Sequence, residues 1–262
     1  MSPPVEIPID AICWSPALKL FCAVGGDWTP DPQIPLALIE TSPDGITWTK
    51  STQRIEKTLS TVCWSPELST FCAISTDATL SLTSTDGVAW TLSAPIPQTP
   101  VPNALMIGSQ VCWSPELLTF CAANQGVTTQ IMTSTNGLVW TARSTGSIGC
   151  LSIAWSPELK MFCTVTSSLN NVDAILTSLD GITWNTPTTP VGDFGLSLDL
   201  VRWSPALRLF CVSGIILSEG ETTGLAFLTS KDGVTWDYYP KYTTELTDLC
   251  WSPRLHKFCT MP

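Results

Sequence analysis

Cysteine is the reactive residue type that this sequence of 262 residues spaces most regularly. Eleven cysteines would suggest a disulfide framework in a secreted chain. There is no Cys-x-x-Cys motif and only one histidine, so we expect neither a metal site nor a bound cofactor. Eight of the cysteines form pairs with a constant spacing of nine: Cys13 with Cys22, Cys63 with Cys72, Cys112 with Cys121, and Cys250 with Cys259.

Two further copies of this spacing have lost the first cysteine. Ala154 stands before Cys163, and Arg202 stands before Cys211. Because a disulfide needs both partners, this tolerance favours cysteine as a small, buried apolar residue. The first residues, Met1 to Glu6, have neither the basic region nor the apolar segment of a secretory signal. We therefore expect synthesis in the cytoplasm and mostly free thiols, with individual disulfides left open.

The residues that could act in acid–base or nucleophilic catalysis form no recognisable set. A nucleophilic triad needs a base, and His256 is expected to be exposed in a loop of the last repeat. We therefore predict a protein without catalytic residues. Paired carboxylates of a glycosidase remain an alternative, because the sequence does not place the acidic residues relative to one another. The residues in question are Asp27, Asp31, Glu40, Asp193 and Asp199.

The elements that position these residues come from a repeated motif, Trp-Ser-Pro-x-Leu-x-x-Phe-Cys. Successive copies are 50, 49, 42, 48 and 48 residues apart, within the range of about 40–50 residues for one propeller blade. In each copy a capped Ser-Pro turn is expected to fold the chain into a hairpin, which places Trp64 opposite Phe71 and Cys63 opposite Cys72. The six copies begin at Trp14, Trp64, Trp113, Trp155, Trp203 and Trp251.

A second motif, Thr-Ser-x-Asp/Asn-Gly-x-x-Trp, lies between copies of the first. Its Asp-Gly or Asn-Gly pair suits a hairpin bend, in which glycine supplies a positive φ. The Ser and Asp side chains are expected to bond the turn's own amides. Asn136 in the third copy indicates that the turn, and not the charge, is required. The motif begins at Thr41, Thr83, Thr133, Thr177 and Thr229.

Two hairpins in each repeat give four strands, so the predicted fold is an all-β propeller of four-stranded blades. We expect a single domain over residues 1–262, with six blades of which the last is incomplete, or alternatively five blades. An insertion at residues 218–223 is predicted to be a loop. The predicted units are 11–58, 59–108, 109–148, 149–198, 199–245 and the half-unit 246–262.

The second motif resembles a known family motif. The segment from Ser42 to Trp48 is similar to the Asp-box of sialidases and related β-propellers, shortened by one residue before the glycine. That resemblance implies a structural box without a catalytic role. A sialidase needs clustered arginines, whereas the five arginines here occupy unrelated repeat positions. The pairing of the two motifs also resembles repeat proteins of phage and large-virus virions, which implies a virion location. The arginines are Arg54, Arg143, Arg202, Arg208 and Arg254.

Charge and hydropathy limit the partners. The net charge is −10, so a chain with few Lys and Arg is poorly suited to nucleic acid or to anionic membranes. No apolar run approaches the roughly 20 residues of a membrane-spanning helix. We therefore expect a partner protein or like subunits, with a glycan as an alternative, and neither nucleic acid nor membrane insertion.

One tryptophan lies outside both motifs and is the predicted ligand contact. Trp28 is flanked by Asp27 and Asp31 in the connection between two predicted strands, where exposed recognition residues are common. We predict a non-enzymatic structural or attachment module that binds a partner through loops. A carbohydrate-binding lectin is the first alternative. One sugar site in each blade would need a repeated set of polar and aromatic residues in the linkers between the motifs, and the linkers of this chain do not repeat. A glycosidase-like enzyme on the same fold is the second alternative.

Overall fold

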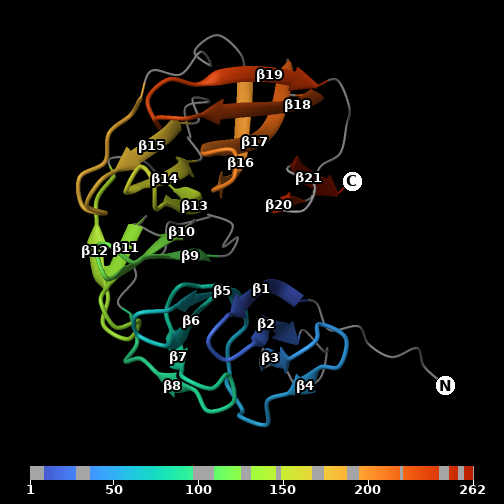
Figure 1. Ribbon diagram of the computed structural model, residues 1–262, viewed down its shortest axis with the longest axis vertical. Helices are drawn as coiled ribbons and strands as arrows, with labels where there is room; N and C mark the ends of the chain where they lie inside the picture. Colours follow the sequence, from blue (N-terminus) through green and yellow to red (C-terminus); the bar gives the residue numbers. More distant parts are fainter. Residues whose placement is uncertain are drawn as a thin grey trace, which may run out of the picture. The chain divides into compact units, whose positions relative to one another are not determined.

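A computed structural model shows a chain built only of β-strands in the part that it describes (Figure 1). No described segment forms a helix long and apolar enough to cross a membrane. The chain divides into two compact units: unit 1 comprises residues 1–122 and 133–141, and unit 2 comprises residues 123–132 and 142–262. The structure describes residues 9–27, 36–96, 109–124, 131–145, 149–166, 174–187, 195–218, 221–241, 248–252 and 257–261.

The first three sheets, called blades 1 to 3, each contain four antiparallel strands in sequence order. Blade 1 is β1 (Ile9–Ser15), β2 (Leu20–Asp27), β3 (Leu36–Ser42) and β4 (Thr49–Lys50). Blade 2 is β5 (Leu59–Ser65), β6 (Thr70–Ser75), β7 (Ser81–Ser84) and β8 (Thr91–Leu92). Blade 3 is β9 (Ser109–Ser114), β10 (Thr119–Asn124), β11 (Ile131–Ser134) and β12 (Thr141–Arg143).

Unit 2 holds blades 4 and 5 and a last, two-stranded sheet. Strand β20 lies against β16, as β16 lies against β13. Blade 4 is β13 (Cys150–Ser156), β14 (Met161–Thr166) and β15 (Ala174–Ser178). Blade 5 is β16 (Gly195–Ser204), β17 (Leu209–Ser218), β18 (Glu221–Ser230) and β19 (Asp237–Lys241). The last sheet is β20 (Asp248–Ser252) and β21 (Lys257–Met261).

The strand register confirms the predicted first hairpin. In blade 2, Trp64 lies opposite Phe71 and Cys63 lies opposite Cys72. The Trp64 and Phe71 rings are 4.7 Å apart between centroids, a separation typical of favourable aromatic pairs. The same register recurs in blades 1, 4 and 5. A β-bulge three to five residues before the motif tryptophan also recurs in blades 1, 2, 4 and 5.

The Ser-Pro turn is capped as expected. The Leu68 N–H donates to Ser65 Oγ at 3.2 Å, and the equivalent bond forms in blades 1, 3, 4 and 5. Ser69 then takes a positive φ of 49°, which brings the chain back into the second strand. The residues at this position are Lys19, Ser69, Leu118, Lys160 and Arg208.

The apolar cores lie between neighbouring blades of each unit. In unit 1, Phe71 and Trp90 of blade 2 pack with Val24 and Ile39 of blade 1. In unit 2, an equivalent cluster joins blades 4 and 5. Of the ten described motif tryptophans, five are buried and four partly buried, whereas Trp14 is 40% exposed.

Two blade edges differ in detail from the prediction. In the predicted loop at residues 218–223, the described residues continue the strands: Leu217 pairs with Thr222 and Ser218 with Glu221, since the β-branched residues nearby sustain strand pairing. Blade 4 has three strands, and its fourth is reduced to one bridge between Thr177 and Asn185. Pro187 follows two residues later and cannot donate a backbone hydrogen bond, so the strand stops there.

Candidate interaction surface at the strand-connecting turns

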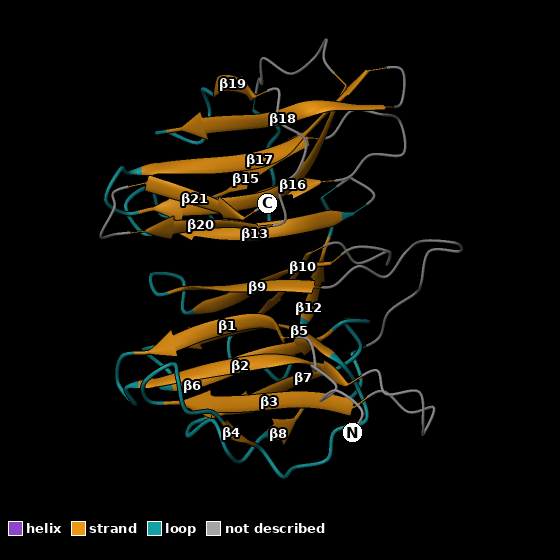
Figure 2. Cartoon of the chain, turned by 90° about the vertical axis from the view of Figure 1, so that its right-hand side faces the viewer, coloured by secondary structure: helices purple, strands orange, loops and turns teal. Residues whose placement is uncertain are grey.

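Each blade places two of its turns at the same end of its sheet. In an antiparallel meander, the turn from first to second strand and the turn from third to fourth strand share one end (Figure 2). We call this the turn end of a blade. In unit 1 it consists of residues 16–19 and 43–48 in blade 1, 66–69 and 85–90 in blade 2, and 115–118 and 135–140 in blade 3.

The Asp-Gly turn is held by its own side chains. Asp86 Oδ1 accepts hydrogen bonds from the Val88 N–H at 2.8 Å and the Ala89 N–H at 2.9 Å. Ser84 Oγ accepts one from the Gly87 N–H at 2.8 Å. The same three bonds recur in the turns at Asp44, Asp180 and Asp232.

Asn136 shows that this turn does not need a charge. Its Oδ1 accepts from the Leu138 and Val139 N–H groups, both at 2.9 Å. Ser134 Oγ accepts from the Gly137 N–H at 2.9 Å. The amide oxygen therefore replaces the carboxylate oxygen without a change in the turn, which confirms the expectation from the sequence.

The carboxylates of these turns are ionised at neutral pH. Backbone hydrogen bonds from Thr47 and Ile46, together with the Ser42 hydroxyl, lower the pKa of Asp44 to about 2. Backbone donors likewise lower the pKa values of Asp86 and Asp232. In Asp180 slight burial opposes the shift, yet the hydrogen bonds still lower the pKa. The Asp-Gly turn of each described blade except blade 3, which has Asn136, thus carries a fixed negative charge.

Within the units, three turn glycines dock their blade on the one before it. Gly87 has φ of 77°, and a Cβ on it would lie 2.9 Å from Thr41 Cγ2 of blade 1. A Cβ on Gly137 would lie 2.7 Å from Thr83 Cγ2 of blade 2. In unit 2, Gly233 packs directly against the thioether of Met161. Glycine is therefore needed for both its conformation and its small size.

Side chains after β4 close the gap between blades 1 and 2. Gln53 Nε2 donates to the Trp90 carbonyl at 2.8 Å, and the Trp90 N–H donates to Gln53 Oε1 at 2.9 Å. The Ser51 hydroxyl donates a hydrogen bond to the Val88 carbonyl oxygen at 3.5 Å. Between blades 2 and 3, Ser81 Oγ donates to the Gly137 carbonyl at 2.8 Å. These bonds fix the turn ends of unit 1 relative to one another.

The turn ends present aliphatic side chains to solvent. The residue after each turn glycine is Ile, Val or Leu, and four of the five are exposed, from 49% at Ile182 to 84% at Ile46. In blade 3 the next residue, Val139, is 71% exposed. The leucine of the first motif is also exposed in four blades, at Leu18, Leu68, Leu117 and Leu207. Packing inside a blade does not explain apolar residues at these positions.

Unit 2 has a cavity of about 440 Å³ at its turn ends. It lies where blade 4 ends its shortened fourth strand and where the blade 5 turn carries Val234. Met161, Leu179, Pro187 and Val234 supply apolar surface. The remaining lining residues are Thr177, Ser178, Asn185 and Thr186.

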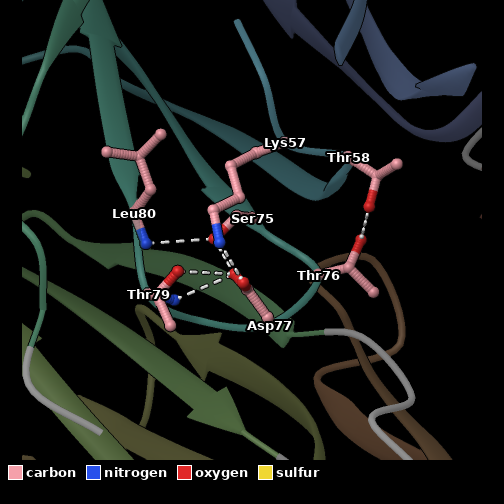
Figure 3. A network of polar contacts seen from close by, with 7 residues as sticks. All are labelled: Lys57, Thr58, Ser75, Thr76, Asp77, Thr79 and Leu80. Carbon is pink, nitrogen blue, oxygen red and sulfur yellow. Dashed lines mark hydrogen bonds and ion pairs between the residues drawn. The ribbon is translucent and has the colours of Figure 1, made fainter. Parts of the chain in front are cut away.

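A polar network anchors the connection between β6 and β7, at the other end of blade 2 (Figure 3). The Lys57 ammonium pairs with the Asp77 carboxylate, which also accepts from the Ser75 hydroxyl at 2.7 Å and the Thr79 hydroxyl at 2.8 Å. Partial burial acts to raise the pKa of Asp77, but Lys57, Ser75 and Thr79 outweigh it and lower that pKa to about 2. The network is satisfied internally, which indicates a structural role.

The predicted ligand residues are not placed by the structure. Trp28 and Asp31 lie outside the described residues. Asp27 ends β2, where its backbone pairs with Leu36, and its side chain is outside the described part. The prediction of a contact at Trp28 therefore stays a prediction.

The acidic residues considered for glycosidase chemistry are not assembled in what is described. Glu40 lies opposite Lys50 in blade 1, and Asp199 is exposed on β16 of unit 2. Asp193 and His256 lie outside the described residues. Within the described ranges, no group of three or more His, Cys, Asp or Glu residues could hold a metal ion.

Sequence reasoning missed the aliphatic residues of the turn ends. The signal was available, because every Asp-Gly or Asn-Gly pair is followed by Ile, Val or Leu. Alternation alone did not reveal that these side chains face solvent, since an aliphatic residue beside a strand is usually counted with the core.

Comparison with known proteins gives the fold. No protein-family model and no curated protein sequence matches the chain. Hydrazine synthase of Kuenenia stuttgartiensis is similar in structure, with a TM-score of 0.64 and 12% identity over 97% of this chain and 74% of that one. TolB from Acinetobacter baumannii has a TM-score of 0.53 and 12% identity, covering 91% of this chain and 56% of that one. A putative gluconolactonase has a TM-score of 0.52 and 12% identity over 96% of this chain and 87% of that one.

These similar structures are β-propellers and include enzyme-like and non-enzymatic proteins. At such low identity they show the fold alone and assign no activity. The chain has the all-β propeller fold that the repeated hairpins predict.

Proposed function

We propose that the chain is a non-enzymatic recognition module that binds a partner protein through its turn ends. The observation that carries the proposal is the exposed aliphatic side chain that follows the turn glycine in four blades, at Ile46, Val88, Ile182 and Val234, with Val139 exposed one residue further along in blade 3. Exposed apolar residues gathered on one surface are typical of protein interaction sites. Within each unit, repetition from blade to blade extends this surface without any change in the core.

Charge defines the partner's chemistry. Asp44 and Asp86 sit beside Ile46 and Val88 and are ionised at neutral pH. The matching partner surface therefore presents apolar side chains flanked by Lys or Arg. A second copy of this chain, with its net charge of −10, is less well matched because like charges repel. The resemblance of the motif pair to virion repeat proteins supports an attachment part of a virion or surface appendage as the setting.

The proposal is tested by selecting a random peptide library displayed on phage against the wild-type protein. We expect enriched peptides rich in apolar and basic residues, whose binding is lost in the triple variant Ile46→Ser/Val88→Ser/Val139→Ser. The control variant Ile12→Ser/Leu92→Ser replaces exposed apolar residues away from the turn ends and should bind normally. Equal binding by the triple variant and the wild type would contradict the proposal.

The two alternatives have distinct readouts. The lectin would be supported if the wild-type protein bound glycans on an array and the triple variant bound the same glycans equally well. Turnover of aryl glycosides by the purified protein would support the glycosidase, and either result would replace the proposed function.

A further inference from the structure

The turn end of unit 1 carries an excess of negative charge. All residues of its six turns are described, and the described ranges break off only after Asp27, Ile96 and Asn124, at the opposite end of the blades. The charged side chains of the six turns are exposed. Four are carboxylates and one is an ammonium, so the formal net charge of this end is −3. They are Asp44, Glu67, Asp86 and Glu116, with Lys19 as the cation.

The described turns of blades 4 and 5 in unit 2 are balanced in charge. They hold three carboxylates and three cations, all exposed, and therefore have a formal net charge of zero. Asp180 and Asp232 make the same turn bonds as Asp44 and Asp86, so the two units differ here in charge and not in turn structure. The charged residues are Glu158, Lys160, Asp180, Arg208, Lys231 and Asp232.

The first residues of the fourth strands keep this difference. In blade 1, Lys50 of β4 lies opposite Glu40 of β3, and side chains that face each other across a strand pair are close enough for opposite charges to compensate. In blade 5, Asp237 at the start of β19 is exposed and adds one negative charge. Unit 2 then stands at −1 against −3 for unit 1.

The acidic end of unit 1 is also apolar and held in place. Each blade presents two exposed aliphatic side chains there, one from each turn. Hydrogen bonds between the blades fix the turns, from Gln53 to Trp90 and from Ser81 to Gly137. A surface fixed before binding loses little conformational freedom when a partner docks. The aliphatic pairs are Leu18 with Ile46, Leu68 with Val88, and Leu117 with Val139.

We infer that unit 1, and not unit 2, binds the basic and apolar segment of the partner protein, across the turn ends of blades 1 to 3. Apolar side chains of that segment cover the aliphatic pairs, and its Lys or Arg groups lie beside Asp44, Asp86 and Glu116. Exposed charges interact over about 8–10 Å at physiological ionic strength, so an end with a charge of −3 attracts a cationic segment more strongly than a nearly balanced end does. This inference rests on the proposed function and names the part of the chain that performs it.

The probe is the capped and fluorescently labelled peptide Lys-Leu-Lys-Leu-Lys-Leu-Lys. Two counterparts replace every Lys by Gln or by Glu and keep the leucines. Fluorescence anisotropy should show that the wild-type protein binds the Lys peptide most tightly and the Glu peptide most weakly, and that added salt weakens binding of the Lys peptide. Binding of the Lys peptide that is absent, or no tighter than that of the Gln peptide, would overturn the inference.

Matched variants separate the two units. Asp44→Asn/Asp86→Asn removes two charges from unit 1 and keeps both turns, because Asn136 supports the same turn. Binding of the Lys peptide should weaken about fivefold, since an exposed ion pair contributes a factor of roughly two to three and two are lost. Asp180→Asn/Asp232→Asn makes the same change in unit 2 and should leave that binding unchanged. Circular dichroism checks the fold of both variants.

The outcomes distinguish this inference from the proposed function. Equal weakening by the two double variants would reject the assignment to unit 1 and leave recognition through the turn ends standing. Undiminished binding by Asp44→Asn/Asp86→Asn, with binding lost in Ile46→Ser/Val88→Ser/Val139→Ser, would reject the role of the carboxylates and leave an apolar contact. Selection of the same library peptides by that triple variant and the wild type is the separate result that contradicts the proposed function itself.

Discussion

The indole Nε1–H of Trp113 donates to Glu67 Oε2 at 2.5 Å and so ties blade 3 to the first turn of blade 2. Trp64 holds the same repeat position in blade 2, yet its Nε1 is buried and finds no partner in the described structure. Blade 1 has Ala17 where blade 2 has Glu67, so Trp64 has no carboxylate at this position to bond, although Trp203 is also unpaired in blade 5 even though blade 4 has Glu158 there. A buried donor left unpaired costs about 1–3 kcal/mol.

Ala17→Glu should therefore stabilise the protein. We expect the free energy of unfolding to rise by about 1 kcal/mol, since the new carboxylate can accept from Trp64 as Glu67 accepts from Trp113. Urea denaturation measures the change. The control is Ala17→Leu, which adds a side chain without an acceptor and should give no gain. A gain in the control equal to that of Ala17→Glu would show that packing, and not the hydrogen bond, is responsible.

Leu118→Gly should stabilise the first turn of blade 3. Leu118 has φ of 48°, a left-handed conformation that costs a residue with a Cβ roughly 1–2 kcal/mol. Glycine removes that cost but adds unfolded-state entropy, so a net gain of about 0.5–1 kcal/mol is expected. The neighbouring Leu117 is not among the positive-φ residues, so Leu117→Gly should only destabilise. Thermal unfolding of the two variants should move in opposite directions.

Acid should destabilise the protein through its depressed carboxylates. Hydrogen bonds hold the pKa values of Asp44 and Asp77 at about 2, against 3.8 for an unperturbed aspartate. A group with a lowered folded pKa stabilises the fold above its unfolded pKa, and this contribution is lost as the pH falls toward the folded pKa. The urea midpoint should thus fall mainly between about pH 4 and 2.

The control for acid sensitivity is Asp44→Asn. Asn136 shows that asparagine supports the same turn, so this variant should keep its stability at neutral pH and lose less of it in acid. A variant with the same acid sensitivity as the wild type would exclude Asp44 as a contributor.

The cysteines should be unreactive in the native protein. Nine of them have described side chains, and all nine are free thiols. Burial raises the pKa values of Cys22, Cys150 and Cys211 to about 12, which leaves very little thiolate at neutral pH. We expect slow reaction with an aromatic disulfide reagent in buffer, and titration of most of the eleven cysteines after unfolding without reductant. Three or fewer titrated thiols would indicate a disulfide-bonded protein instead.

The sequence predicted those features that depend on local chemistry. The pairing of Trp64 with Phe71 follows from a fixed turn length, and the bonds of Asp44 and Asn136 follow from turn chemistry. What depends on neighbouring blades was not predictable. The cavity in unit 2 is lined both by Pro187 of blade 4 and by Val234 of blade 5, and no periodicity reveals that.

Glycine substitutions in two turns should separate backbone strain from crowding. Gly45 and Gly87 have φ of 74° and 77°, so Ala at either position bears the left-handed cost of roughly 1–2 kcal/mol. They differ in surroundings: a Cβ on Gly45 would lie 3.5 Å from the Phe21 ring, an ordinary contact, whereas one on Gly87 would lie 2.9 Å from Thr41 Cγ2. Gly87→Ala should therefore lower the free energy of unfolding by more than Gly45→Ala does. Thr41→Ser removes the crowded methyl group, so in a double-mutant cycle it should recover part of the loss in Gly87→Ala and none in Gly45→Ala. Equal losses in the two single variants, without recovery by Thr41→Ser, would mean that blade 2 shifts away from blade 1 at no cost and that the glycine contact does not hold the blades together.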